Sequence, residues 1–350
     1  INKLKIYLNH SKHNFNILSN LISAYDSCKN FKTTINENTT YIDSLLTDIN
    51  SISEYKISFN KLCELGTLMK IFYTLHNDFK IYEVLNYSFC LNGFIDNNIE
   101  LSLLVKDKKL NECKFTKNKT VINNGFYASL INTKYITNTI DLSSNIVISG
   151  PNAAGKTTIL KSVLFNIILS QQFGFGCYSS AEINVYDKLF CYLNIPDTNN
   201  RDSLFQAEAK VCKNIIDYID NNENENCLCI FDELYSGTNP DEAINSAYTL
   251  LNYLSDKKCK SLLTTHFYNL CELLEKNQTY INVKMKVNNN NNNIKFTYKL
   301  EEGISNIKGA SDILKKLNYP KEILNNIDNL NNKIDISNNK IDISNNKIDI

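Results

Sequence analysis

The sequence predicts an α/β protein in which a nucleotide-binding domain follows a helical region. Two observations carry this prediction. The apolar run 146–148 leads into a loop bounded by glycines, residues 150–155, and a helix-compatible segment, 159–164, follows. A second apolar run, 227–231, ends at two consecutive acids. Short apolar runs that alternate with helical segments are typical of a sheet whose strands are buried on both faces.

Composition limits the possible classes of protein. The chain has 350 residues, which is enough for two or three domains, and it starts at Ile1, which suggests a fragment of a longer protein. Lys+Arg and Asp+Glu number 37 each, so any basic surface for nucleic acid must be local. Eleven cysteines at no disulfide-framework or metal-ligand spacing suit a reducing intracellular compartment. No signal peptide or long apolar run is present, so we expect a soluble protein with no membrane partner.

Residues 1–92 are predicted to be helical. Apolar residues recur at helical spacing in two stripes, which we expect to face a core: Ile42, Leu45, Leu46 and Ile49, then Leu62, Leu65, Met69 and Phe72. A coiled-coil arm is the alternative, but the heptads are too few to favour it. Between residues 93 and 145 the pattern shortens, as in 100–105, which predicts strands leading into the nucleotide domain.

The loop after the first apolar run fits the Walker A pattern. It reads Gly150, Pro151, Asn152, Ala153, Ala154, Gly155, Lys156, Thr157, Thr158. In this strand–loop–helix context, backbone N–H groups and the helix N-terminus cradle a polyphosphate. Lys156 is expected to reach the β- and γ-phosphates of ATP, and the Thr157 hydroxyl to ligate Mg²⁺. The alternative is a glycine-rich turn with a chance lysine.

The two acids after the second run are Asp232 and Glu233. Carboxylates at the C-terminal end of a buried parallel strand lie where ligands bind in open α/β sheets. Asp232 fits the Walker B role of holding Mg²⁺, and Glu233 fits the general base that polarises the hydrolytic water. Two acids after a strand are weak evidence alone, but they follow a complete phosphate loop here.

Two further side chains are candidates for the same site. The run 261–265 predicts a third buried strand, and it ends at His266. A neutral imidazole there can hydrogen-bond the γ-phosphate or water, although a lone histidine is more often structural. Gln172, which we place at the end of the strand after the phosphate-loop helix, is expected to contact Mg²⁺ or the attacking water. Its alternative is a polar loop residue.

The C-terminal part combines a hairpin with low-complexity sequence. Residues 280–287 and 294–300 predict two strands joined across the asparagines 288–293. From residue 331 the unit Asn-Asn-Lys-Ile-Asp-Ile-Ser repeats, and its isoleucines lie two residues apart, which is not a leucine-zipper spacing. We expect residues 328–350 to form a disordered tail.

The three motifs resemble those of one family. Residues 150–158 resemble the "GPN…GK(S/T)T" loop of the MutS family of DNA mismatch-repair ATPases, 232–238 its "DE…GT" stretch, and 264–270 its "ATH(Y/F)xxL" switch. The resemblance covers roughly residues 120–327. It implies an ABC-type P-loop ATPase domain with a mixed sheet over residues 93–327, preceded by a helical core or lever-like region, 1–92, and followed by the tail.

The resemblance also implies two further site residues. Residues 135–142 are similar to the family's "(F)xxNxxxL" run, in which the aromatic stacks on adenine, and this position is Tyr135. The family's signature loop, "DD…GRSTF", corresponds to residues 197–208, where its glycine is missing, and Ser203 is the candidate for contacting the partner subunit's γ-phosphate.

By this resemblance the chain is a DNA-dependent ATP hydrolase. It implies a homodimer, or a heterodimer with a MutS-like paralogue, that couples ATP hydrolysis to a clamp on mismatched or branched duplex DNA. Two alternatives remain: a MutS-related recombination ATPase that binds branched DNA and ignores mismatches, and the nucleotide-binding subunit of an ABC transporter. The transporter would need an LSGGQ-type signature before the Walker B strand, and residues 213–226 contain none.

Overall fold

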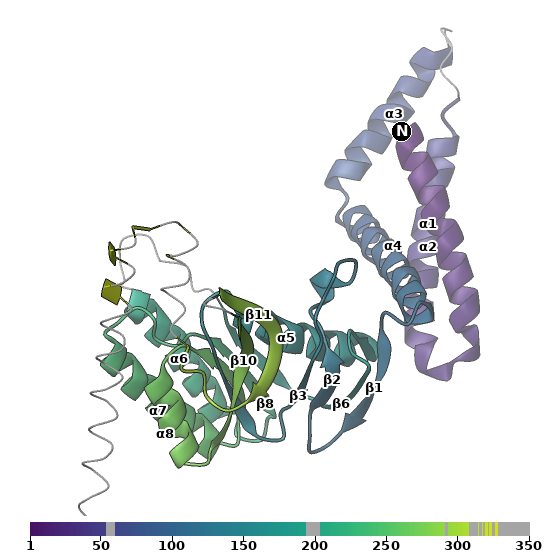
Figure 1. The fold of residues 1–350 in the computed structure, drawn as a ribbon. Helices are drawn as coiled ribbons and strands as arrows, with labels where there is room; N and C mark the ends of the chain where they lie inside the picture. The colour runs from purple at the N-terminus through teal and green to yellow at the C-terminus, as the bar shows by residue number, and fades with distance from the viewer. Residues whose placement is uncertain are drawn as a thin grey trace, which may run out of the picture. The chain divides into compact units, whose positions relative to one another are not determined.

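The computed structural model describes residues 1–53, 60–193, 204–290 and 293–307, and also positions 314, 317, 319, 320, 322, 323, 326 and 327. The chain divides into two compact units, Ile1–Lys106 and Asp107–Ile350, which are described separately (Figure 1). The predicted tail, 328–350, lies outside the described residues.

The first unit is helical, as predicted. It consists of α1 (Asn2–Leu21), η1 (Ile22–Ala24), η2 (Asp26–Cys28), α2 (Lys29–Asn50), α3 (Asn60–Asn77) and α4 (Phe79–Lys106). The apolar stripe of α2 is buried as expected, at Ile42, Leu45, Leu46 and Ile49. These side chains form a core with residues of α1 and α4, such as Phe15 and Val84.

Two expectations for this unit are wrong. On α3, Leu65, Met69 and Phe72 are 49%, 65% and 48% exposed, because the helix packs on the core through Ile71 and Leu75. The side chain of Leu62 is not among those that the structure describes. Residues 100–105 are not a strand, since α4 continues through them to Lys106. Their alternation is compatible with the period of a strand, but the run Leu103-Leu104-Val105 is equally compatible with a helix. The helical unit therefore extends beyond residue 92.

The second unit contains two sheets. The smaller one has the strand order β3-β2-β6-β1-β5 and includes parallel and antiparallel neighbours. Its strands are β1 (Asn111–Thr116), β2 (Val121–Gly125), β3 (Asn138–Asp141), β5 (Phe175–Gly176) and β6 (Ser180–Asn184). The short helix η3 (Ala128–Leu130) lies between β2 and β3 in the sequence.

The larger sheet has the order β11-β10-β4-β9-β8-β7. Its strands are β4 (Asn145–Ser149), β7 (Lys188–Tyr192), β8 (Cys227–Asp232), β9 (Lys260–Thr265), β10 (Tyr280–Asn290) and β11 (Asn293–Glu302). All neighbours are parallel except β10 and β11, which form the predicted antiparallel hairpin. The mixed α/β class predicted from the sequence is confirmed.

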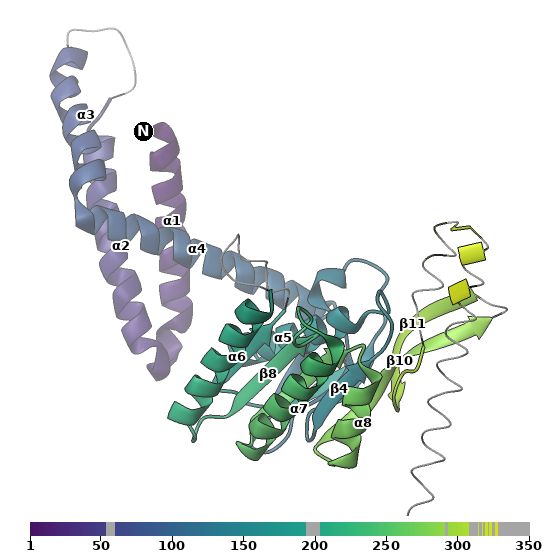
Figure 2. The same cartoon turned by 90° about the vertical axis from the view of Figure 1, so that its left-hand side faces the viewer.

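Helices cover both faces of the larger sheet. They are α5 (Lys156–Phe173), α6 (Leu204–Asn221), α7 (Pro240–Asp256) and α8 (Tyr268–Lys276). Figure 2 shows α6, α7 and α8 along one face. Alternate residues of β4 enter different cores: Val147 packs with residues of α6, α7 and α8, whereas Ile146 and Ile148 pack with residues of α5. The apolar runs of the sequence are therefore strands buried on both faces.

Among the helices of the described ranges, none has both the length and the apolar sequence needed to cross a bilayer.

Candidate functional site

The three sequence motifs meet at one edge of the larger sheet. Strands β4, β9 and β8 are consecutive parallel neighbours. Their register sets Ser149 opposite Thr265, and Asp232 opposite Thr264. Because parallel strands end at the same edge, the segments that follow β4, β8 and β9 are brought together.

The loop 150–155, the predicted phosphate loop, depends on a left-handed backbone conformation at Gly155. This residue precedes the first turn of α5, and its φ is +98°. A Cβ at this position would lie 3.1 Å from Cδ1 of Tyr298, on β11. Glycine is the residue that adopts such a conformation without steric cost, and it also leaves room for the tyrosine ring. The loop geometry is thus set by its own sequence and by the distant hairpin.

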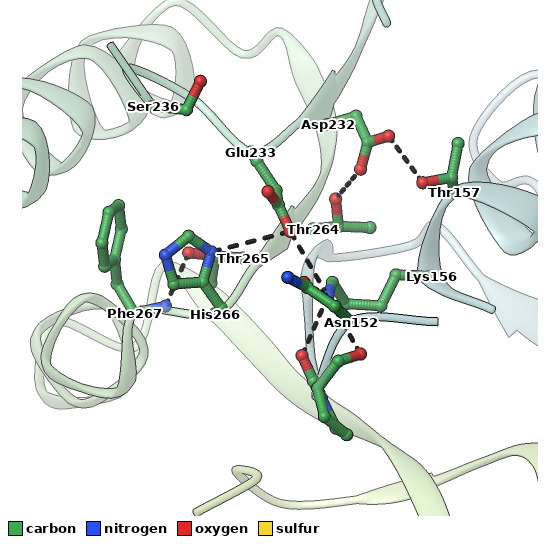
Figure 3. A network of polar contacts seen from close by, with 12 residues as sticks. Asn152, Lys156, Thr157, Asp232, Glu233, Ser236, Thr264, Thr265, His266 and Phe267 are labelled. Atoms are coloured by element: carbon green, nitrogen blue, oxygen red, sulfur yellow. Dashed lines mark hydrogen bonds and ion pairs between the residues drawn. The ribbon is translucent and has the colours of Figure 1, made fainter. Parts of the chain in front are cut away.

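Lys156 lies inside the loop, and its side chain is only 5% exposed. Its ammonium donates hydrogen bonds to the carbonyl oxygens of Gly150 at 2.9 Å and Pro151 at 3.2 Å. Oδ1 of Asn152 lies 3.5 Å from the same nitrogen, and Oε1 of Glu233 lies 3.3 Å away (Figure 3). The buried cation therefore points to the centre of the site, where a polyphosphate would need it.

Thr157 and Asp232 form a group of oxygen ligands next to this cation. The Thr157 hydroxyl donates to Oδ2 of Asp232 at 2.7 Å, and the Thr264 hydroxyl donates to Oδ1 (Figure 3). Hydroxyl and carboxylate oxygens are the donors that Mg²⁺ takes in nucleotide sites, where waters and phosphates complete its coordination. The described ranges contain no cluster of three or more His, Cys, Asp or Glu that could hold a metal. The Thr157–Asp232 pair therefore fits the predicted Mg²⁺ ligands.

Glu233 follows Asp232 in a strained conformation. Its φ is +53°, and its backbone N–H donates to the carbonyl of Thr264 at 3.1 Å. Its carboxylate lies between Lys156 and Nδ1 of His266, which is 3.6 Å away. The contact with His266 and the charge of Lys156 lower the pKa of Glu233 to about 2, although burial opposes this shift. The carboxylate is thus ionised at neutral pH and ready to accept a hydrogen bond.

His266 lies at the end of β9, as the sequence predicted. Its ring contacts Phe267 with a centroid separation of 4.3 Å, and the Phe267 N–H donates to the Thr265 hydroxyl at 3.0 Å. Figure 3 shows the imidazole directed towards Glu233. A movement of the Glu233 carboxylate would therefore change its contact with His266.

A cavity of about 710 Å³ opens over these residues. This volume lies within the range typical of small-molecule sites. The predicted residues on its wall are Tyr135, Asn152, Ala153, Gly155, Lys156, Thr157, Thr158, Asp232 and Glu233. Of the other loop residues, Gly150 and Pro151 accept hydrogen bonds from Lys156, and Ala154 is buried in the core.

Tyr135 forms one wall of the cavity. Its ring stacks on Phe126 with a centroid separation of 3.9 Å and an interplanar angle of 8°. The buried Phe126 thus fixes the orientation of a partly exposed aromatic face, which suits stacking with a nucleobase.

Seven residues on the wall are not among the site residues predicted from the sequence: Leu130, Lys134, Ile136, Asn138, Ile159, Ser236 and Tyr298. Tyr298 comes from β11, far beyond the motifs in the sequence, and no local signal identifies it. Its φ of +59° is the one structural sign of a special position. Ser236 belongs to the segment after Glu233, which had a signal in its resemblance to the "DE…GT" stretch.

The placement of Gln172 at a strand end is wrong. Helix α5 continues to Phe173, so Gln172 lies exposed in its last turn. At a rise of about 1.5 Å per residue, this turn is roughly 24 Å along the helix from Lys156. The neighbouring Gln171 instead bonds the backbone of Tyr186 at 2.9 and 3.1 Å. Ser203, the other uncertain site residue, lies outside the described residues.

Comparison with known proteins supports the resemblance. The sequence profile of MutS domain V matches residues 146–335, which is more than half of the chain. The chain is 31% identical over 197 residues to the DNA mismatch repair protein MutS of Finegoldia magna, covering 55% of this chain and 22% of that protein. It is 32% identical over 184 residues to MutS of Orientia tsutsugamushi, covering 51% and 20%.

A third relative extends the match. MutS of Prochlorococcus marinus is 28% identical over 239 residues, or 66% of this chain and 25% of that protein. The aligned region is thus about a fifth to a quarter of the length of these relatives. The match covers β4, β8 and β9 together with the loops that follow them, and this chain belongs to the MutS family.

Proposed function

We propose that this chain binds and hydrolyses ATP with Mg²⁺, as the ABC-type ATPase part of a MutS-type DNA mismatch-repair protein. One observation carries the proposal: Lys156, Thr157, Asp232 and Glu233 converge at a single cavity although they come from two distant segments. A cation, a pair of hard oxygen ligands and a carboxylate in one place are the parts that phosphoryl transfer requires.

Binding begins with the phosphates. Without a ligand, the ammonium of Lys156 contacts two carbonyl oxygens and Glu233. The phosphate oxygens of a triphosphate are charged acceptors and would bind this ammonium more strongly than the carbonyl oxygens do. The N-terminus of α5 adds its partial positive charge on the same side. Thr157 and Asp232 would hold Mg²⁺, which neutralises charge on the phosphate oxygens. Tyr135 and Tyr298, which also line the cavity, offer aromatic surface to the base.

Glu233 would orient the attacking water. Its low pKa makes it a weak base while Lys156 and His266 both contact it. A phosphate that draws Lys156 away removes one cause of this low pKa, so the carboxylate becomes more basic when substrate is bound. His266 remains beside Glu233 and limits its motion. The chain thus links its water-activating residue to occupancy of the phosphate loop.

The DNA and partner assignments follow from the family. The relatives are named DNA mismatch repair proteins, and we propose that ATP turnover here controls a clamp on mismatched duplex DNA. In this proposal the chain acts as a homodimer, or as a heterodimer with a MutS-like paralogue, with Ser203 as the residue that reaches the partner's nucleotide. The family match gives no support to the transporter alternative.

The test is ATP turnover of the purified chain, alone and with homoduplex, mismatched and four-way-junction DNA. Glu233→Gln should abolish turnover while ATP binding persists, and Glu275→Gln, an exposed acid on α8, is the matched control. Stimulation by mismatched duplex supports the repair assignment. Preference for the junction would favour a recombination role, and turnover that survives Glu233→Gln would refute the assignment of this site.

A further inference from the structure

Glu208 is a buried acid on α6 that no step above uses. It is 2% exposed and accepts hydrogen bonds from the segment after the Walker B strand. Its Oε1 accepts from the Ser236 backbone N–H at 3.1 Å and from the Ser236 hydroxyl at 2.9 Å, and its Oε2 accepts from the Gly237 N–H at 3.2 Å. Each of these donors is neutral, so backbone and hydroxyl dipoles stabilise the carboxylate.

The same segment makes close contact with the first turn of α6. A Cβ on Gly237 would lie 2.8 Å from Cβ and Cγ of Leu204 and from the backbone nitrogen of Phe205. The Phe205 and Tyr235 rings lie 5.5 Å apart. Only a glycine allows this approach, because any side chain would displace helix backbone. The segment 234–237 is therefore docked on α6 by packing as well as by Glu208.

The docked segment carries backbone strain next to the water-activating residue. Glu233 and Tyr235 are both outside the usual region for L-residues, with φ of +53° and +57°. Conformations of this kind persist only where surrounding contacts hold them. Ser236, the residue after Tyr235, lines the nucleotide cavity. The three hydrogen bonds to Glu208 tie Ser236 and Gly237, at the far end of this strained turn, to α6.

We infer that Glu208 is a positioning residue of the nucleotide site: by anchoring Ser236 and Gly237 to α6, it holds the turn that aims the Glu233 carboxylate at the phosphate-loop lysine. This inference rests on the proposed ATPase function. The hydrogen bonds of Glu208 go to Ser236 and Gly237 and not to the phosphate loop or to the Mg²⁺ candidates Thr157 and Asp232. It therefore acts on turnover only through the turn.

The informative variant is Glu208→Gln, which keeps the shape of the side chain. Its amide nitrogen would face the Gly237 N–H, so that a donor meets a donor, and the negative charge is lost. We expect kcat for ATP to fall by about 10- to 100-fold with KM nearly unchanged, because phosphate binding uses other residues. The control is Glu242→Gln, an exposed acid that accepts from the neighbouring Thr238 at 2.8 Å, and it should turn over ATP like the original chain.

Amide hydrogen exchange gives a second readout that does not need turnover. In Glu208→Gln, exchange in a peptide spanning 232–237 should accelerate by about tenfold or more, while a peptide spanning the phosphate loop, 150–158, should not change. Unchanged kcat, or a parallel loss of kcat, ATP affinity and melting temperature, would overturn the inference. If the original chain hydrolyses no ATP, the proposed function fails, and exchange at 232–237 still decides whether Glu208 anchors the turn.

Discussion

The Thr157 hydroxyl donates a 2.7 Å hydrogen bond to Oδ2 of Asp232, although 75 residues separate the two in the sequence. Thr157 lies in the first turn of α5, and Asp232 is the last residue of β8. Strand β9 lies between β4 and β8, and its Thr264 hydroxyl donates to the other oxygen of the same carboxylate. The order of the strands thus places both Mg²⁺ candidates together with a third group that fixes the carboxylate orientation.

Asp232→Asn is expected to weaken Mg²⁺ binding and therefore to slow ATP turnover. The amide keeps the hydrogen bond from one hydroxyl but loses the charge that a divalent cation needs. We expect kcat to fall by about 100-fold and the concentration of Mg²⁺ for half-maximal turnover to rise. A Mg²⁺ titration of ATP hydrolysis measures both. Asp241→Asn, on an exposed turn of α7, is the control, and an equal loss in the two variants would contradict a metal role for Asp232.

Gly155→Ala should damage the phosphate loop through its backbone. The added Cβ meets the Tyr298 ring at 3.1 Å, and the φ of +98° is unfavourable for alanine. A loss of about 1–3 kcal/mol in unfolding free energy is expected, together with loss of ATP binding. The matched change is Gly93→Ala in α4, where nothing lies within 4 Å, and which should stabilise by about 0.5–1 kcal/mol. Urea unfolding measures the change in unfolding free energy for both variants. Equal changes would mean that the left-handed backbone of Gly155 is not the cause of the loss.

Tyr135→Leu should weaken binding of the base but not of the phosphates. The tyrosine ring stacks on Phe126 and faces the cavity, whereas the phosphate loop is formed by other residues. Loss of an aromatic face costs about 0.5–1.5 kcal/mol, which corresponds to roughly 2- to 10-fold in affinity for ATP. Inorganic tripolyphosphate, which has no base, should bind with unchanged affinity. Calorimetric titration with both ligands separates the two effects, and an equal loss for both would place Tyr135 outside the base site.

The sequence predicted the centre of this site well, because each motif directly follows a run of buried residues. The runs that end at Ser149, Asp232 and Thr265 are strands, and parallel pairing then brings their ends together. Tyr298 could not be predicted in this way. It reaches the cavity because β10 pairs with β4 and carries β11 with it, which is a long-range relationship with no local signal.

The errors have a local cause. Gln172 belongs to α5 and not to a strand, because the residue that ends this helix is Gly174, with a φ of +79°. In α4, apolar residues such as Leu103 and Leu104 are adjacent, and a short run of this kind fits a helix or a strand equally well. On α3, periodicity identified a stripe but not which face meets the core, because Ile71 takes that role.

The lowered pKa of Glu233 predicts how stability depends on pH. Its ordinary value is 4.5, and in the folded chain it is about 2, because His266 and Lys156 stabilise the carboxylate. Between these two pH values the unfolded chain binds more protons at Glu233 than the folded chain does. The contribution of Glu233 to the free energy of unfolding therefore rises with pH. The contribution is fully present above about pH 4.5 and is lost as the pH falls through 2. Discounted for partial exposure, it amounts to roughly 1–2 kcal/mol.

Glu233→Gln should therefore flatten the acid limb of the stability profile. Urea unfolding between pH 7 and pH 3 measures the difference, and the glutamine variant should lose about 1 kcal/mol less than the original chain over this range. Glu275→Gln provides the matched comparison on a surface helix and should leave the slope unchanged. Parallel profiles for the original chain and Glu233→Gln would mean that Lys156 and His266 do not stabilise this carboxylate in solution. In that case Glu233 would have an ordinary pKa before ATP arrives, and the proposed rise in its basicity on substrate binding would lose its physical cause.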